Sequence, residues 1–179
     1  MLRKVEMGMV RLAKEKDLGR INELRKQVND IHVEGRPDIF KAGFGVELRD
    51  YAYTLMNGEN SDIIVAERNG EICGMACVDY VHRPETAYGK ARSFYHVQEI
   101  AVDENYRRQG VAKELLDFMI ADTRKRKLKK IELDVWEFND SAIEFYQATG
   151  FKERCSDHCT ERFGRCTYPG GNRKPVGLR

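Results

Sequence analysis

The six residues RRQGVA, 107–112, stand between an apolar segment and an amphipathic one. Arg107 and Arg108 supply positive charge, and Gly110 and Ala112 are small enough for a ligand to approach the backbone closely. At the start of a helix the first N–H groups have no intrahelical partner, and the helix dipole places partial positive charge there. Such a turn binds phosphate and other anions. The pattern therefore predicts a site for a phosphate-bearing ligand.

This turn differs from the two most common nucleotide-binding patterns. The chain contains neither the GxxxxGK[ST] pattern of a P-loop nor the GxGxxG pattern of a Rossmann dinucleotide site. Both of those sites are disfavoured, although the turn keeps the charge and the small residues that suit a phosphate group.

Hydrophobic periodicity predicts the elements that must position the turn. A strand is expected directly before it, over 93–102, and an amphipathic helix directly after it, from Val111 to about Arg126. The other expected elements are a strand at 9–13, helices at 17–33 and 46–56, a loop at 32–45, strands at 62–67 and 72–81, a loop at 82–92, a strand at 131–136 and a helix at 141–149. Asp17 and either Asn139 or Asp140 are the expected helix caps, and Gly150 is expected to end the last helix.

The order of these elements is β-α-α-β-β-β-α-β-α. Asn69-Gly70 predicts a hairpin and therefore antiparallel strands, whereas the strand–helix–strand crossover of 93–136 requires a parallel pair. The fold class is α/β (α+β), with a mixed, mostly antiparallel central sheet flanked by helices. With 179 residues the chain has the size of one domain, which we place at 1–154. Residues 155–179 are an atypical polar tail, expected to be partly disordered.

The composition is that of a soluble globular protein, with 41% hydrophobic residues, 34% charged residues and a mean hydropathy of −0.61. No segment has the roughly 18–20 consecutive apolar residues of a membrane span, and the first ten residues lack the apolar core of a signal peptide. The cysteines number five, which is odd, and Cys73 and Cys77 lie in an apolar segment, which favours reduced thiols. These features predict a cytoplasmic protein without a membrane partner.

The net charge of +2 argues against a general affinity for nucleic acid. The one dense basic run, at 124–130, stands at the end of a predicted helix, where cations interact favourably with the helix dipole. We interpret the run as a solvated helix end and expect no nucleic-acid partner. Homodimers are the commonest assemblies, so a homodimer is the alternative to a monomer.

Residues 97–120, VQEIAVDENYRRQGVAKELLDFMI, resemble the acetyl-coenzyme A signature of the GNAT superfamily of N-acetyltransferases. The core pattern of that signature is Arg/Gln-x-x-Gly-x-Gly/Ala, which Arg107, Gly110 and Ala112 match. The setting matches as well, because the pattern follows a strand and opens an amphipathic helix.

A second stretch, LDVWEFNDSAIEFYQATGFKE, resembles a downstream motif of the same family. That motif has an asparagine after the fifth strand, a tyrosine seven residues later and a closing Gly-Phe, which correspond here to Asn139, Tyr146, Gly150 and Phe151. The two motifs stand in the family's order and spacing, and the resemblance extends over roughly residues 9–153.

The resemblance implies acetyl-CoA as co-substrate and no metal. It implies that the backbone of Ile100 and Val102 pairs with the pantetheine arm, that Asn139 hydrogen-bonds the pantetheine, and that Tyr146 donates a proton to the departing thiolate. The residues that would wrap the pyrophosphate are Arg107, Arg108, Gln109, Gly110, Val111, Ala112 and Lys113.

The group that would take a proton from the acceptor amine stays open. Glu99, on the strand before the turn, is the first candidate for this catalytic role. His96 and Asp134 are rivals, because family members place this group on either strand, and water is a further alternative. A β-bulge beside the site would change which face of the sheet each of these residues occupies.

The acceptor side of the chain has two unusual features. The resemblance places the loop at 32–45 beside the acceptor, with Glu34, Arg36 and Asp38 as candidate selectors. Family members also end with a further strand after the Gly-Phe, but residues 153–171 are too polar and too rich in turn formers to predict a clear strand.

Four residues of the tail are potential metal ligands, but they lack the paired CxxC spacing of a zinc site: Cys155, His158, Cys159 and Cys166. No metal site is predicted there. The sequence predicts an N-acetyltransferase that transfers an acetyl group from acetyl-CoA to a primary amine of a small molecule or peptide by direct attack. The alternative is a non-catalytic acetyl-CoA-binding sensor or interaction module with the same motifs.

Overall fold

The structure is a computed structural model that describes residues 8–154 and 163–169, with the backbone alone for 153, 154 and 163–169. Its strands form one sheet in the order β1-β2-β3-β4-β5-β7-β6. Their bounds are β1 Met9–Leu12, β2 Ser61–Arg68, β3 Glu71–Arg83, β4 Arg92–Val102, β5 Lys130–Trp136, β6 Lys152–Arg154 and β7 Phe163–Pro169. Every neighbouring pair is antiparallel except β4 and β5, which are parallel. The predicted mixed, mostly antiparallel sheet is therefore confirmed.

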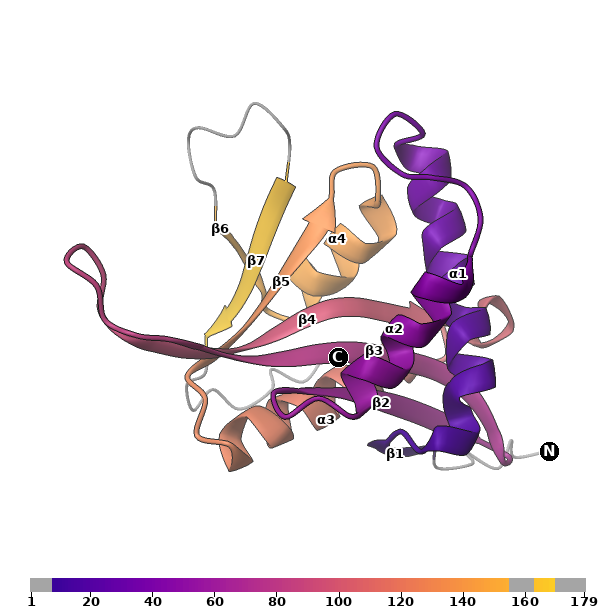
Figure 1. The fold of residues 1–179 in the computed structure, drawn as a ribbon, viewed down its shortest axis with the longest axis horizontal. Coiled ribbons are helices and arrows are strands. Elements are labelled where there is room, and N and C mark those ends of the chain that lie inside the picture. The colour runs from indigo at the N-terminus through magenta and orange to yellow at the C-terminus, as the bar shows by residue number, and fades with distance from the viewer. Residues whose placement is uncertain (1–7, 155–162, 170–179) are drawn as a thin grey trace.

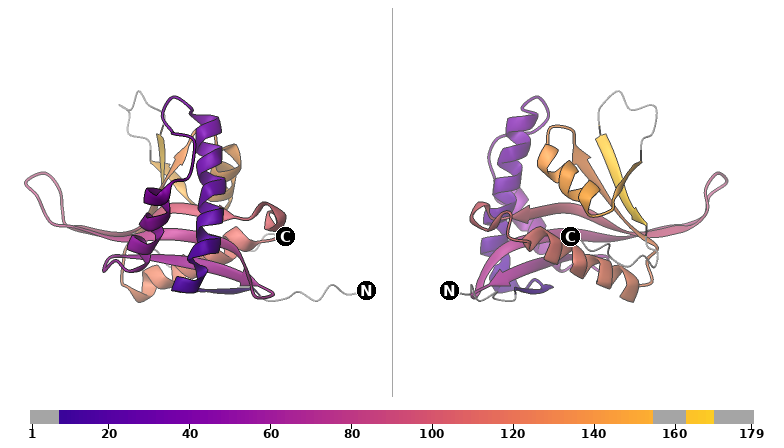
Figure 2. Two further views of the ribbon diagram at one scale, coloured as in Figure 1. Left: turned by 45° about the vertical axis from the view of Figure 1, so that its right-hand side comes forward. Right: turned by 180° about the vertical axis from the view of Figure 1, so that it is seen from behind.

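Within the described residues, four helices cover the two faces of this sheet (Figures 1 and 2). They are α1 Leu18–Gly35, α2 Val46–Met56, α3 Val111–Lys125 and α4 Asp140–Ala148. Helices α1 and α2 lie on one face, and α3 and α4 lie on the other. Short 3-10 turns at Glu15–Asp17 and Glu104–Tyr106 precede α1 and α3.

Each face has its own apolar core, because the helices bury one stripe of side chains against alternate residues of the strands. Under α3, Leu115 and Met119 are almost completely buried against residues of β2 to β5. Under α1 and α2, Ile21, Leu24 and Ala52 are fully buried against the opposite face. The two cores hold the helices firmly on the sheet.

The sheet splits between β4 and β5. These strands pair only over Tyr95–Val97 and Ile131–Leu133, and beyond Val97 the strand β4 pairs with β3 alone. The register of β3 and β4 also shifts between Cys77 and Val78, which leaves Gln98 as an extra residue of a β-bulge. The carboxyl-terminal half of β4 therefore has an edge that β5 does not cover.

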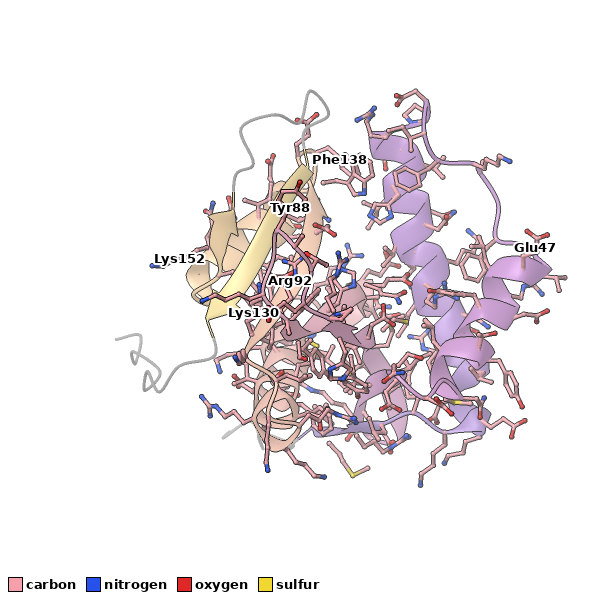
Figure 3. The ribbon with its side chains drawn as sticks, turned by 60° about the vertical axis from the view of Figure 1, so that its left-hand side comes forward. Glu47, Tyr88, Arg92, Lys130, Phe138 and Lys152 are labelled. Atoms are coloured by element: carbon pink, nitrogen blue, oxygen red, sulfur yellow. The ribbon has the colours of Figure 1, made fainter. Side chains whose placement is uncertain are left out.

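Most predicted elements are present with small changes of length. Helix α1 ends at Gly35, so the loop starts at Arg36 and not at residue 32. Strands β3 and β4 continue to Arg83 and from Arg92, so only 84–91 of the predicted 82–92 loop is non-regular. These strands form a long hairpin with Tyr88 fully exposed at its end (Figures 1 and 3).

Asp17 was predicted to cap α1, but its side chain makes no capping hydrogen bond to that helix. Its buried carboxylate accepts hydrogen bonds from Arg11 Nη1, at 2.6 Å, and from the backbone N–H of Lys14, at 2.8 Å. The residue therefore ties β1 to the turn before α1. By contrast Asn139 caps α4 and Asn69-Gly70 forms the hairpin turn with positive φ at both residues, as predicted.

The sequence left open whether the tail forms a last strand, and the structure shows that Phe163–Pro169 forms β7. This strand pairs antiparallel with β5 over its whole length, from Trp136 opposite Phe163 to Lys130 opposite Pro169. The edge of β5 provides unpaired backbone N–H and C=O groups, which a polar segment can satisfy as well as an apolar one. Residues 155–162 and 170–179 lie outside the described residues, and the division of the chain at 154 stays a prediction.

Candidate active site

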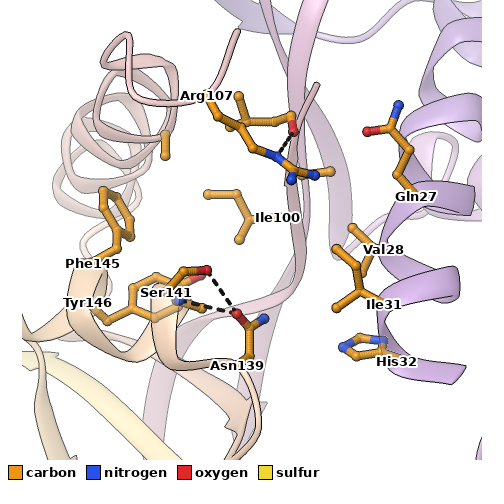
Figure 4. Close-up of a pocket in the computed structure, with 14 residues that line it drawn as sticks. Gln27, Val28, Ile31, His32, Ile100, Arg107, Asn139, Ser141, Phe145 and Tyr146 are labelled. Carbon is orange, nitrogen blue, oxygen red and sulfur yellow. Dashed lines mark hydrogen bonds between the residues drawn. The ribbon is translucent and has the colours of Figure 1, made fainter. Parts of the chain in front are cut away.

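A cavity of about 240 Å³ lies between α1, the end of β4 and α4, at the split in the sheet (Figure 4). Two segments far apart in the sequence meet there, the turn at 107–112 and the start of α4. The residues of the predicted cofactor site that line the cavity are Ile100, Val102, Arg107, Ala112, Asn139 and Tyr146. The tertiary structure therefore brings the two sequence motifs together on one pocket.

The other predicted residues of the turn lie around the cavity and do not line it. Val111 is buried in the core under α3, and Lys113 pairs with Asp117 on the helix surface, with 2.6 Å between Nζ and Oδ2. Arg108 and Gly110 have left-handed backbone conformations, with φ of 61° and 87°. These values turn the chain sharply into α3, where the intrahelical bonds start with Glu114 N–H to Gly110 C=O at 3.0 Å. The preceding N–H groups are the ones available to an anion.

Two residues outside the motifs hold this turn in place. Arg68 of β2 donates to the backbone carbonyl of Gln109, at 3.0 Å, and to Oε1 of Glu114, at 2.7 Å. Gly74 of β3 lies under α3, since a Cβ there would be 2.7 Å from Val111 Cγ1. Neither residue carries a sequence signal for this role, because the contacts join segments more than 35 residues apart.

Asp103 fixes the other end of the turn. It is 4% exposed and accepts a hydrogen bond from Asn105 N–H at 2.9 Å and from Arg20 Nη2 of α1 at 2.6 Å. Burial works against ionisation, but the bonds from Asn105 and Arg20 outweigh it and lower the pKa of this carboxyl. The turn is therefore tied to α1, which forms the opposite wall of the cavity.

Asn139 and Tyr146 are held rigidly on α4. The Oδ1 atom of Asn139 accepts hydrogen bonds from Ala142 N–H and Ser141 Oγ, both at 3.2 Å. The ring of Tyr146 lies edge-on between Phe145 and Phe151, with centroid distances of 5.3 and 5.2 Å, and the residue is 4% exposed. This packing fixes the direction of the phenol, which is what an acid aimed at one atom requires.

Glu99 does not line the cavity. The bulge places Gln98 and Glu99 on the same face, where Gln98 accepts from Tyr51 of α2 at 2.9 Å and Glu99 accepts from Arg25 Nε of α1 at 3.0 Å. Burial raises the pKa of Glu99, and the Arg25 guanidinium partly offsets this rise. The structure therefore holds the first candidate for the base in a partly buried ion pair.

His96 lies between two carboxylates. Its Nδ1 is 3.7 Å from Asp79 Oδ2 on β3, and its Nε2 is 3.6 Å from Asp134 Oδ2 on β5. Hydrogen bonding to Asp134 and Asp79 raises the pKa of His96 to about 9, despite partial burial. The imidazole is therefore protonated at neutral pH and has no lone pair with which to accept a proton.

We expect the charge on His96 to make folding stability depend on pH. The pKa is about 9 in the folded state and 6.5 without partners, so the stabilisation is complete below pH 6.5 and is lost as pH rises through 9. The free energy of unfolding should fall by about 1–3 kcal/mol over this range. Urea unfolding from pH 6 to 10 measures it, and His96→Gln should remove the fall. A variant that keeps the full fall would show that other groups cause it.

An aromatic cluster joins the end of α1 to the β5–α4 connection. His32 stacks on Phe40 with 5.0 Å between centroids, and Phe40 meets Trp136 edge-on at 5.2 Å. Phe138, in the connection between β5 and α4, lies 6.1 Å from both His32 and Trp136 and points toward α1 (Figure 3). A Cβ on Gly35 would be 2.5 Å from the Phe138 ring, so glycine permits this approach. Of this cluster, His32 lines the cavity together with Asn139.

Of the three candidate selectors, Arg36 and Asp38 lie together and Glu34 lies apart from them. Arg36 pairs with Asp38, with 2.8 Å between Nη2 and Oδ2, and its guanidinium carbon lies 5.6 Å from the centroid of Trp136. Glu34 is exposed on the last turn of α1. Charge therefore contributes less to this wall of the cleft than the aromatic rings, which no sequence motif marks.

The possible metal ligands of the tail are mostly outside the described residues, which include only the backbone of Cys166. Within 8–154 there is no group of three or more His, Cys, Asp or Glu side chains that could hold a metal ion. The same part of the chain contains no helix with the length and apolar character needed to cross a membrane.

The comparisons with known proteins agree on one family. The family model for the acetyltransferase (GNAT) family matches residues 25–151. The [ribosomal protein bS18]-alanine N-acetyltransferase of Escherichia coli is 41% identical over 121 residues, which cover 63% of this chain and 74% of that protein. An uncharacterized N-acetyltransferase of Methanocaldococcus jannaschii is 32% identical over 108 residues, 59% of this chain but less than half, 46%, of the relative.

Solved structures share the fold. A mutant of the BH1408 protein from Bacillus halodurans superimposes with a TM-score of 0.79 at 26% identity, covering 86% of this chain and 98% of that one. An aminoglycoside N-acetyltransferase in complex with CoA has a TM-score of 0.70 over 90% of this chain and 99% of its own. Its 18% identity shows a common fold and nothing further.

Proposed function

Because the chain belongs to the acetyltransferase (GNAT) family, we propose that it transfers an acetyl group from acetyl-CoA to a primary amine by direct attack. The observation that carries the proposal is that Arg107 and Ala112 of the turn line the same cavity as Asn139, which caps α4, and Tyr146 of α4. An anion site and a rigid proton donor at the two ends of one pocket suit a ligand with a pyrophosphate at one end and a thioester at the other.

The residues present fit acetyl-CoA. The turn at 107–113 has N–H groups without intrahelical partners, Gly110 leaves the backbone open since no atom lies within 4 Å of a Cβ there, and β4 has an edge not covered by β5. In the proposed complex Arg107 and the turn hold the pyrophosphate, the edge at Ile100 and Val102 binds the pantetheine, and Asn139 hydrogen-bonds it. Bound acetyl-CoA supplies the activated acetyl group as a thioester.

The chain's own contribution to the reaction is position and proton transfer. The two walls of the cavity would hold the amine and the acetyl carbon in line and exclude water. Tyr146 would give its hydroxyl proton to the thiolate, since its ring is fixed by Phe145 and Phe151. No metal takes part in this proposal.

For the acceptor, we propose a small-molecule or peptide amine, with a protein α-amine as the first class to examine, in view of the relative from E. coli. We also propose a cytoplasmic location. In support, Cys73 and Cys77 are buried free thiols, and burial raises the pKa of both, as expected for reduced, packed cysteines.

The test is an acetyl-transfer assay with the full chain. We expect thiol release from acetyl-CoA, and a mass increase of one acetyl group on at least one member of a panel of peptides with free α-amines, lysine peptides, small amines and aminoglycosides. Calorimetry on the same sample measures the affinity for acetyl-CoA. Tight binding without transfer to any amine would contradict catalysis and support the non-catalytic sensor.

A further inference from the structure

None of the groups proposed from the sequence as the base is well placed to accept a proton. Glu99 is paired with Arg25 and does not line the cavity. His96 is held in its protonated form by Asp79 and Asp134, and the Asp134 carboxylate is itself engaged with that cation. A base for an amine needs a neutral lone pair or a carboxylate at the cavity itself.

His32, in the last turn of α1, lies at such a place. It lines the cavity together with Asn139 and Tyr146. Figure 4 shows it at the end of the pocket near Asn139, away from Arg107. The contact of 6.1 Å between the centroids of His32 and Phe138, the neighbour of Asn139, confirms this position. Within the described residues, no hydrogen bond is made by either ring nitrogen of His32.

The surroundings of His32 keep the imidazole neutral. One face of the ring stacks on Phe40, at 5.0 Å and 19° between ring planes, and the edge of Phe138 meets it at 80°. Burial among these rings lowers the pKa of His32 below 6.5, and no charged group adds to this shift. On the neighbouring loop Arg36 forms an ion pair with Asp38, so their opposite charges offset each other. Among the residues of α4 that line the cavity, Tyr146 is the one with a titratable side chain.

We propose that His32 is the catalytic residue that accepts the proton of the acceptor amine, across the pocket from the acid Tyr146. This inference rests on the acetyl transfer proposed above and names a residue for it. The amine nitrogen forms the C–N bond while the C–S bond breaks, with its electron pair going to sulfur. His32 takes the proton that nitrogen loses, and Tyr146 gives its proton to sulfur. Through solvent, His32 then loses a proton and Tyr146 gains one, so both side chains regain their starting protonation states.

The aromatic stack has a defined part in this mechanism. Rings on two sides of His32 leave the imidazole few orientations, and they keep water from stabilising its charged form. Because the lowered pKa favours the neutral imidazole, His32 has a lone pair with which to act as a base at neutral pH. The stack therefore tunes and orients the base, and Phe40 and Phe138 act as positioning residues.

The test uses two variants of the full chain. His32→Phe keeps an aromatic ring on Phe40 but cannot accept a proton, whereas Phe40→Leu removes the stack and keeps the imidazole. We expect His32→Phe to lower kcat by about 10²–10³-fold with an unchanged Kd for acetyl-CoA. In wild type, kcat/KM should fall as pH drops through the pKa of His32. This acidic limb should vanish in His32→Phe and persist in Phe40→Leu.

Two measurements make the outcome decisive. The pH profile is recorded with two acceptor peptides whose α-amines differ in pKa, because a limb caused by the acceptor moves and a limb caused by His32 does not. NMR of the His32 ring follows its titration and should show a shift on addition of acetyl-CoA. A normal rate and pH profile in His32→Phe, or a His32 pKa above 7, would overturn this inference alone. Absence of transfer by wild type would instead overturn the proposed function together with it.

Discussion

Replacing Tyr146 with phenylalanine is expected to lower kcat for acetyl transfer by about 10²–10⁴-fold and to leave the affinity for acetyl-CoA within about two-fold of wild type. The substitution removes only the hydroxyl group. The ring keeps its edge-on contacts with Phe145 and Phe151, and the residue is almost fully buried, so the fold and the cavity wall are retained. The loss therefore reports proton donation to the leaving thiolate.

Tyr95→Phe is the matched control for this prediction. Tyr95 is also fully buried, but it packs on Tyr80 at 5.3 Å and does not line the cavity. Thiol release measures kcat for both variants, and calorimetry measures Kd. Above the pKa of the CoA thiol, the sulfur can leave as a thiolate without receiving a proton. The deficit in kcat of Tyr146→Phe should therefore shrink as pH rises. Equal rates for Tyr146→Phe and wild type at neutral pH would remove Tyr146 as the acid.

Substitution of Gly110 by alanine is expected to weaken acetyl-CoA binding by at least about ten-fold. Gly110 has φ of 87°, which places an L-residue under strain of about 1–2 kcal/mol. As the residue before α3, it also sets the direction of the N–H groups that follow. Relief of the strain would turn those groups away from the pyrophosphate.

Gly70→Ala separates this effect from a simple loss of stability. Gly70 has φ of 80°, and a Cβ on either glycine would meet no atom within 4 Å, so the two substitutions impose a similar strain. Gly70 lies in the β2–β3 turn and has no part in the cavity. Both variants should lose similar stability in urea unfolding, whereas only Gly110→Ala should lose affinity in calorimetry. Equal affinities would show that the turn does not hold the pyrophosphate through its backbone.

The fold was accessible from the sequence where its signals are local. The apolar spacing of α3, the Asn-Gly turn between β2 and β3 and the cap at Asn139 all depend on residues only a few positions apart. Strand β7 was not accessible in this way. Its polar residues lack the alternation of a strand, and it is formed because β5 provides an unpaired edge.

The candidate site likewise has residues that stand out in the sequence and residues that only the folded structure identifies. The turn at 107–112 and the pair Asn139 and Tyr146 stand out in the sequence, and the structure places residues of both on one cavity. The roles of Arg68 and Gly74 do not stand out, because each acts on the turn from a distant strand. His32 belongs to no motif in the sequence, and only its packing on Phe40 and Phe138 distinguishes it.

By itself, the sequence determined the order of elements as far as α4, the mixed sheet and the two motifs with their family, because these follow from short-range spacing and residue type. Only the tertiary structure decided the charge and the direction of the candidate bases. The bulge at Gln98 turns Glu99 toward Arg25, and strands β3 and β5 bring Asp79 and Asp134 to His96. The protonation state of a side chain depends on burial and on charges contributed by other segments, and these are known only when the chain is folded.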